Sequence, residues 1–216
     1  MNFTEIYQAF IGGLVQTGLL EYIAVAAGIT SVWFSKKENI LVYPIGLINT
    51  VLYIYLSLKG HLIGEASVNL FYTVMSIYGW ILWARHDKQN RKSIVIQFCT
   101  VKEWIGYLLF FAALYAIIFF SLLFLKNDFA PGAIPSADAF ASASAYTGML
   151  LMAQKKVESW YWWIVTNIAS IPLYFVKGYV FTSFQFLVLL IMAISGLISW
   201  YKKAKNASKE SHHFGS

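Results

Sequence analysis

Long stretches without a charged residue are the feature of this sequence that most restricts its fold. Five windows lack Asp, Glu, Lys and Arg altogether: Asn39–Leu58, Ala66–Ala84, Trp104–Leu125, Ser159–Val176 and Gly178–Tyr201. A helix needs about 20 apolar residues to cross the hydrocarbon of a bilayer, whereas barrel strands are about half as long. Backbone groups in lipid must also be paired within their own segment. The windows therefore predict transmembrane helices.

Two weaker windows bring the predicted number of spans to seven. Leu20–Ser35 contains Glu21 near one end, and Ala139–Gln154 is short and rich in Ala and Ser, which is typical of helices packed against other helices. Asn2–Gly18 mixes apolar and polar residues and predicts a short interfacial helix. Asn206–Ser216 predicts a mobile polar tail. Only 12% of the residues are charged, against about 25% in soluble domains, which excludes an ordinary soluble fold.

The lysines and arginines predict the orientation of these spans. With seven spans, 13 of these residues fall on one side of the membrane and 3 on the other, namely Lys59, Lys126 and Lys177. Because cytoplasmic connections are enriched in Lys and Arg, the N-terminus should lie outside and the C-terminus in the cytoplasm. The basic residues form short clusters between apolar runs rather than one basic face, so no nucleic-acid partner is expected for the net charge of +6.

An internal repeat is visible when the chain is compared with itself. A shift of 118 residues aligns Asn49 with Asn167 and Lys59-Gly60 with Lys177-Gly178, and after a gap of one residue Gly79–Trp83 falls on Gly196–Trp200. The alternative explanation is the shared composition of apolar helices. The repeat predicts an all-α membrane protein with a parallel 3+1+3 arrangement, in which solutes bind at the interface between repeats. The expected segments are an interfacial segment (1–19), a first three-helix repeat (20–84), a linker helix (104–125), a second repeat (137–203) and a cytoplasmic tail (204–216).

Candidate solute-binding residues gather on one helical stripe. Side chains three and four positions apart share a helix face, so Trp163, Asn167, Ser170 and Tyr174 line up within Ser159–Val176. The stripe offers an indole for stacking, an amide and two hydroxyls. An Asn inside a span is costly unless it pairs across helices or faces a cavity, so Asn167 is expected to point inward.

Other spans supply further candidates. Asn49 and Tyr53 hold matching positions in the first repeat, and Asn69 and Gln185 lie in two other spans. Asn69 and Gln185 have an alternative role as polar contacts that hold helices together. Some of the tryptophans in Trp160–Trp163 have an alternative place in the aromatic belt at the membrane surface.

Several kinds of chemistry lack a sequence signal. No Asp, Glu, Lys, Arg or His lies inside the five clean windows, whereas proton relays and ion-coupled pumps need such a group. The sequence contains no Walker A, HExxH or GxSxG motif, and its single cysteine, Cys99, has no clustered metal ligands around it. A facilitator is therefore favoured, with no catalytic residue, metal or cofactor expected.

Several motifs of the second repeat resemble those of the PnuC family of nicotinamide riboside transporters. They are Trp163-xxx-Asn167, Glu158-Ser-Trp, Leu173-Tyr174, Lys177-Gly178, Thr182-Ser183 and Gly196-xxx-Trp200. The resemblance extends from Leu20 to Lys203. It implies a fold like an enlarged SWEET sugar transporter, a homotrimer, and facilitated diffusion across the bacterial inner membrane with trapping by intracellular phosphorylation. It also implies that Trp163 and Asn167 form the substrate motif. In the first repeat, Ile45 occupies the position that corresponds to Trp163, so the two halves should contact different parts of the ligand.

The chemistry of nicotinamide riboside agrees with these side chains. Its flat cationic ring suits an indole, its amide suits an Asn, and its ribose hydroxyls suit polar side chains. Thiamine, which is also a flat cation, or another vitamin or nucleoside is the alternative substrate. A SWEET-type sugar facilitator is a weaker alternative, and a membrane-embedded enzyme or sensor is weaker still, because the sequence has neither buried ionisable groups nor an extra soluble domain.

Overall fold

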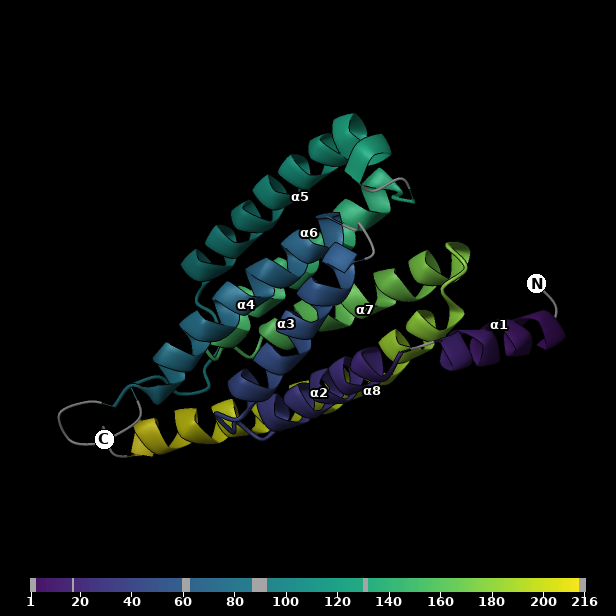
Figure 1. Ribbon diagram of the computed structural model, residues 1–216. Helices are drawn as coiled ribbons and strands as arrows, with labels where there is room; N and C mark the ends of the chain where they lie inside the picture. The colour runs from purple at the N-terminus through teal and green to yellow at the C-terminus, as the bar shows by residue number, and fades with distance from the viewer. Residues whose placement is uncertain (1–2, 17, 60–62, 87–92, 130–131, 214–216) are drawn as a thin grey trace.

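The computed structural model describes residues 3–16, 18–59, 63–86, 93–129 and 132–213. These residues form eight helices, shown in Figure 1: α1 (Phe3–Gln16), α2 (Leu19–Lys36), α3 (Val42–Lys59), α4 (Ile63–Ala84), α5 (Val101–Phe129), α6 (Pro135–Ala153), α7 (Ser159–Val176) and α8 (Val180–His213). Beyond the helices, the described residues contain one isolated bridge, between Gln97 and Lys156. The prediction of an all-α fold is confirmed. Asn2, Gly60 and Ser216, which the sequence predictions name, lie outside the described part, as do Lys88, Arg91 and Lys92 among the 13 basic residues counted for one side of the membrane.

Each of the seven predicted windows coincides with one helix, and the differences at the ends have local causes. α3 begins at Val42 rather than Asn39, because Asn39 forms the preceding turn and its Oδ1 accepts a hydrogen bond from Leu41 N. α8 begins at Val180 because Gly178 adopts a φ of 85°. Within the predicted polar tail, α8 continues to His213, so the described part of the tail is helical. Lys and Ala, which are frequent there, are good helix formers and extend an established helix.

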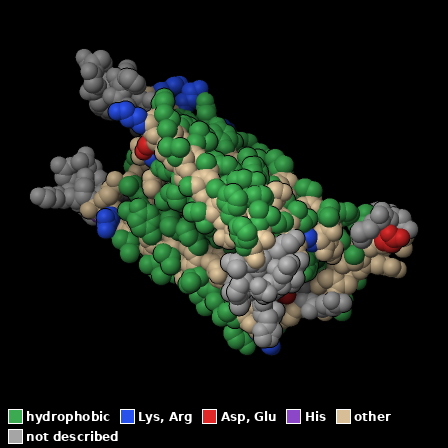
Figure 2. Space-filling view, turned by 90° about the horizontal axis from the view of Figure 1, so that it is seen from above, with side chains coloured by type: hydrophobic (Ala, Val, Ile, Leu, Met, Phe, Trp, Pro, Cys, Tyr) green, Lys and Arg blue, Asp and Glu red, His purple; other side chains and the backbone are tan. Residues whose placement is uncertain are grey.

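Three helices are long and apolar enough to cross a membrane by length and composition, over Val42–Lys59, Val101–Phe124 and Val180–Ala207. The pair α1 and α2, bent by 104°, would supply a fourth span. The other helices are less apolar, because α4 and α7 carry several Trp, Tyr and polar side chains and α6 is rich in Ala and Ser. Figure 2 shows a broad apolar surface with Lys and Arg towards its edges. This chain is a multi-pass membrane protein.

The helices pack as two sets of three, which we call the first triplet (α2, α3, α4) and the second triplet (α6, α7, α8). Within each triplet, the middle helix packs against both others. Between triplets, α4 packs against α6 and α2 packs against α8 (Figure 1). The first helix of each triplet therefore meets the third helix of the other. α5 packs against α6, and α1 packs against α8.

The two triplets repeat the same aromatic contact 117 residues apart. In the first triplet, Tyr43 meets Trp83 edge-on, with ring centroids 5.2 Å apart and an interplanar angle of 88°. In the second, Trp160 meets Trp200 edge-on at 5.5 Å and 88°. Both contacts lie at the GxxxW sequences that end at Trp83 and Trp200. These contacts show that structurally equivalent residues of the two triplets are 117 positions apart in the sequence.

This register corrects the alignment of Asn49 with Asn167. At a shift of 117, Asn167 corresponds to Thr50, and both side chains are buried. At a shift of 118, Thr50 would correspond to Ile168, which is 55% exposed. Packing favours 117 as well, because Gly46 lies against Ser31 just as Trp163 lies against Gly148. The counterpart of Trp163 is therefore Gly46 rather than Ile45. Asn49 and Asn167 are the same amino acid but do not occupy equivalent structural positions.

Candidate functional site

An aromatic cluster, formed by Tyr72, Tyr146 and Trp163, lies where the two triplets meet. The Trp163 ring of α7 and the Tyr72 ring of α4 have centroids 6.4 Å apart. Tyr72 in turn meets Tyr146 of α6 edge-on at 5.9 Å. Gly148 of α6 lies against the same helix, since a Cβ at that position would come 3.2 Å from the Cβ of Trp162 and 3.4 Å from the indole of Trp163. The first triplet thus meets the predicted substrate tryptophan through Tyr72.

Asn167 lies one turn after Trp163 on α7 and is only 3% exposed. Its side chain forms no hydrogen bond within the described part of the chain. Burying an amide without a partner is costly, so an unpaired amide beside an aromatic cluster is suited to receive a polar ligand. Ser170, on the same stripe, is also buried.

Asn49, unlike Asn167, has a hydrogen-bond partner within its own triplet. Its Nδ2 donates a hydrogen bond to the Ala24 carbonyl at 2.7 Å, and it lies against Gly28 of α2. The side chain therefore ties α3 to α2 inside the first triplet. Tyr53 and Asn69 are both half-buried, on α3 and α4, and the Asn69 carbonyl accepts a hydrogen bond from Thr73.

Tyr174 lies further along α7. Its ring stacks on Phe186 of α8, with centroids 5.1 Å apart, and the Lys177 Nζ lies 5.6 Å from the ring centroid. Gln185, on α8, is half-buried. The eight predicted residues thus come from α3, α4, α7 and α8. Trp163 reaches across to the first triplet, whereas the hydrogen bond of Asn49 and the ring stacking of Tyr174 on Phe186 each lie within one triplet.

None of the eight predicted residues lines either of two hollows that lie on the described part of the molecule. The first, of about 510 Å³, is lined by the connection after α2, the end of α4, His86 and Lys155. The second, of about 700 Å³, is lined by α1, Glu21 and the connection between α7 and α8. The predicted substrate residues remain a prediction.

The sequence reasoning missed Tyr72 and Tyr146. A signal was present, because each lies near the middle of its apolar window rather than at an end. Tyrosines of the aromatic belt lie at the membrane surface, where their hydroxyls reach water. A tyrosine at mid-window must instead face other helices or a cavity, because lipid offers its hydroxyl no partner.

Buried charge is concentrated at one end of the molecule. Among the described residues, the buried charged side chains are Lys155, Lys156 and Glu158, all in the connection between α6 and α7. Lys156 pairs with Glu103 at 2.6 Å, and one oxygen of Glu158 accepts a hydrogen bond from Cys99 N. The contacts described for Trp163 are instead with neutral residues, Tyr72 and Gly148.

The family pattern described as nicotinamide mononucleotide transporter matches residues 18–202 of this sequence. The chain belongs to this family. Among its relatives, the nicotinamide riboside transporter PnuC of Escherichia coli is 23% identical, with 86% of each chain covered. PnuC of Neisseria mucosa is 29% identical, over 88% of this chain and 74% of the relative. The riboflavin/roseoflavin transporter RibM of Streptomyces davaonensis is 24% identical, with 84% of each chain covered.

The fold is that of a solved member of the family. The chain superimposes on a crystal structure of the vitamin B3 transporter PnuC with a TM-score of 0.71, covering 95% of this chain and 94% of the other at 23% identity. These relatives are named as transporters, in line with the expectation that this family member is not an enzyme.

Proposed function

We propose that this chain is a facilitated-diffusion transporter that imports nicotinamide riboside across the bacterial cytoplasmic membrane. The observation that carries the proposal is the position of Trp163 against Tyr72, across the boundary between the triplets, with the unpaired amide of Asn167 one turn away. Two of the relatives named above are nicotinamide riboside transporters. The substrate would lie between the two triplets.

Each part of this ligand has a matching group. The cationic pyridinium ring would lie against the faces of Trp163 and Tyr72, where cation–π attraction contributes about 0.5–2 kcal/mol. The carboxamide would pair with the Asn167 amide, which relieves the cost of burying both groups. Ser170 and Gln185 are candidates for the ribose hydroxyls, together with Asn69 and Tyr53. This division of roles explains why Gly46 stands in the first triplet where Trp163 stands in the second.

Uncoupled transport is supported by the distribution of charge. Proton coupling needs an ionisable side chain within the pathway, and ion coupling commonly uses one. In the described residues, the buried charges lie in the connection between α6 and α7, whereas the aromatic cluster itself is made of neutral side chains. Net import would then require a cytoplasmic enzyme that phosphorylates the solute, since a phosphorylated product no longer fits a neutral aromatic site.

The proposed fold is a SWEET-like 3+1+3 arrangement of seven spans, with α5 as the linker and α1 at the membrane surface. The mutual packing of the first and third helices of the triplets supports it, as does the aromatic contact repeated 117 residues apart. Lys37, Lys155 and Lys203 gather at one end, which we assign to the cytoplasm by the excess of positive charge there. We further propose a homotrimer, from the resemblance to the family.

Riboflavin is a second candidate substrate, because the riboflavin/roseoflavin transporter is as similar to this chain as the Escherichia coli relative. Its ring system is flat but neutral, so it would stack without the cation–π contribution. Thiamine, which is a flat cation, is a third candidate. A SWEET-type sugar would make little use of the aromatic cluster.

A binding panel on the purified protein separates these candidates. Calorimetric titrations with nicotinamide riboside, thiamine, riboflavin and a deoxynucleoside should give saturable binding of nicotinamide riboside, at least about tenfold tighter than the others. Proteoliposomes should then equilibrate labelled nicotinamide riboside without an ion gradient, and ionophores should leave the rate unchanged. Tighter binding of riboflavin or thiamine, or uptake that stops when an ion gradient is removed, would refute the assignment.

A further inference from the structure

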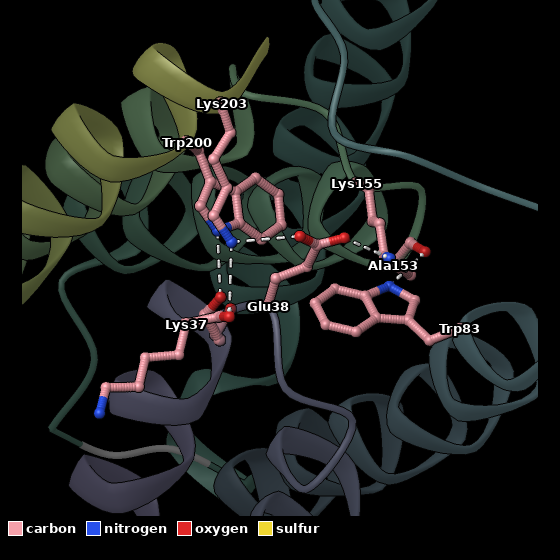
Figure 3. A network of polar contacts seen from close by, with 8 residues as sticks. Lys37, Glu38, Trp83, Ala153, Lys155, Trp200 and Lys203 are labelled. Atoms are coloured by element: carbon pink, nitrogen blue, oxygen red, sulfur yellow. Dashed lines mark hydrogen bonds and ion pairs between the residues drawn. The ribbon is translucent and has the colours of Figure 1, made fainter. Parts of the chain in front are cut away.

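The two triplets are joined at the lysine-rich end by a pair of crossed hydrogen bonds, drawn in Figure 3. Trp83, at the end of α4, donates from Nε1 to the Ala153 carbonyl at the end of α6, at 3.1 Å. Trp200 of α8 donates in the same way to the Ser35 carbonyl near the end of α2, also at 3.1 Å. Each indole therefore caps the first helix of the opposite triplet. The two rings lie 6.1 Å apart at the centre of this arrangement.

The same two helix ends turn through a left-handed residue. Glu38, after α2, has a φ of 60°, and Lys155, after α6, has a φ of 54°. Both are the αL residue of a matching turn, since Asn39 N bonds Phe34 O and Lys156 N bonds Leu151 O. Glycine is the residue usually found in this conformation, because a side chain there costs free energy. Because both positions carry a charged residue instead, their side chains are expected to form interactions that offset this cost.

These two side chains bind each other across the boundary between the triplets. Lys155 Nζ lies 2.8 Å from Glu38 Oε1, with 2% of the lysine side chain and 17% of the glutamate side chain exposed. Lys203 of α8 approaches the other carboxylate oxygen at 3.2 Å. Lys155 Nζ also lies 4.6 Å from the ring centroid of Trp83. Equivalent positions of the repeat thus carry opposite charges, and the pair joins the two halves.

We propose that the Glu38–Lys155 ion pair, with the crossed Trp83 and Trp200 hydrogen bonds, is the inner gate of the transport pathway, closed in this structure. The contacts are polar and link different triplets, so a relative rotation of the triplets breaks them together. The hollow of about 510 Å³ has Glu38, Lys155 and Trp83 in its wall, and in this proposal it serves as the exit vestibule. This inference rests on the proposed transport function.

The ion pair of Lys156 with Glu103 provides a matched control at the same end. It is as short, at 2.6 Å, but it joins the connection between α6 and α7 to α5 rather than to the first triplet. Breaking it should disturb local packing without opening the boundary between the triplets.

The test measures access to the aromatic cluster from the lysine-rich side. A Cys99→Ser, Tyr72→Cys protein carrying Lys203→Gln is reconstituted in liposomes, and molecules with that side outward are labelled with a membrane-impermeant thiol reagent. Lys203→Gln prevents a swapped lysine at position 38 from meeting a like charge. Glu38→Lys and Lys155→Glu should each speed labelling at position 72 by about tenfold or more, corresponding to a loss of about 1.4 kcal/mol from the closed state. The combined charge swap should slow labelling again, and Glu103→Lys should leave it unchanged.

The gate would be overturned if Glu103→Lys sped labelling as much as Glu38→Lys and Lys155→Glu do. It would also be overturned if Glu38→Lys and Lys155→Glu were both labelled at the rate of the protein without a charge change. A failure of the combined swap to slow labelling relative to the single variants would overturn it as well. Size-exclusion profiles check that each variant is folded, and Glu38→Gln replaces Glu38→Lys if the latter aggregates. Because labelling needs no substrate, the gate and the choice of substrate are tested separately: failure of the nicotinamide riboside titration leaves the labelling result intact.

Discussion

Gly196 lies directly against the ring of Trp160: a Cβ at position 196 would come within 2.4 Å of the Trp160 indole. The equivalent pair in the first triplet is Gly79 and Tyr43, where the distance would be 2.5 Å. In each triplet, the glycine of GxxxW makes room for an aromatic ring of the middle helix. That ring then meets the tryptophan that ends the motif, so the glycine positions the side chain that bonds the opposite triplet.

Replacing Gly196 by Ala should destabilise the protein. The methyl group would overlap the rigid Trp160 ring, and overpacking of this kind costs about 1–3 kcal/mol. Thermal unfolding in detergent should show a clear fall in Tm. Gly106→Ala is the control, because no atom lies within 4 Å of a Cβ at that position and Ala favours the helix. Equal Tm values for the two variants would contradict the close packing.

Asn167 and Asn49 should respond differently to the same substitution. Asn167→Leu should abolish binding of nicotinamide riboside while leaving the oligomer folded, because its amide is proposed to serve the ligand. Asn49→Leu should mainly lower stability, by about 0.5–2 kcal/mol, because it removes the hydrogen bond to Ala24 O. Calorimetric titration and thermal unfolding of both variants separate the two roles. Unchanged affinity in Asn167→Leu would remove Asn167 from the site.

Trp163 should be needed for its aromatic face. Trp163→Leu should weaken binding of nicotinamide riboside by about 2- to 30-fold, the range of a cation–π contribution, and Trp163→Phe should weaken it less. Trp33→Leu is the control, since Trp33 is 42% exposed on α2. An equal loss for Leu and Phe at position 163 would indicate that shape, rather than attraction to the aromatic face, decides affinity.

The inner gate should weaken in acid. Burial by itself raises the pKa of Glu38, but hydrogen bonds and positive charge from Lys155 and Lys203 outweigh it, so the pKa lies below its ordinary value of 4.5. A carboxyl with a lowered pKa contributes stability above the ordinary value and loses it as the pH falls through the lowered one. Tm should therefore fall below pH 4.5 more steeply in the natural protein than in Glu38→Gln. Parallel curves would mean that the charge of Glu38 contributes little.

Much of the helical architecture was predictable from residues close together in the sequence. In lipid, each segment must satisfy its own backbone hydrogen bonds, so a long uncharged window leaves one solution, a helix. The seven windows accordingly coincide with α2 to α8. The stripe of Trp163 and Asn167 also follows from helical spacing alone.

The tertiary structure decided which of these side chains meet. Asn49 and Asn167 share an amino acid but not a structural position, because their roles depend on neighbours, Ala24 O for one and the triplet boundary for the other. Tyr72 joined the candidate site only through Trp163, which lies 91 positions away in the sequence. Glu38 and Lys155 look like ordinary loop charges until the triplets come together. Periodicity determines the face of a helix, whereas pairing across helices depends on the packing of the whole chain.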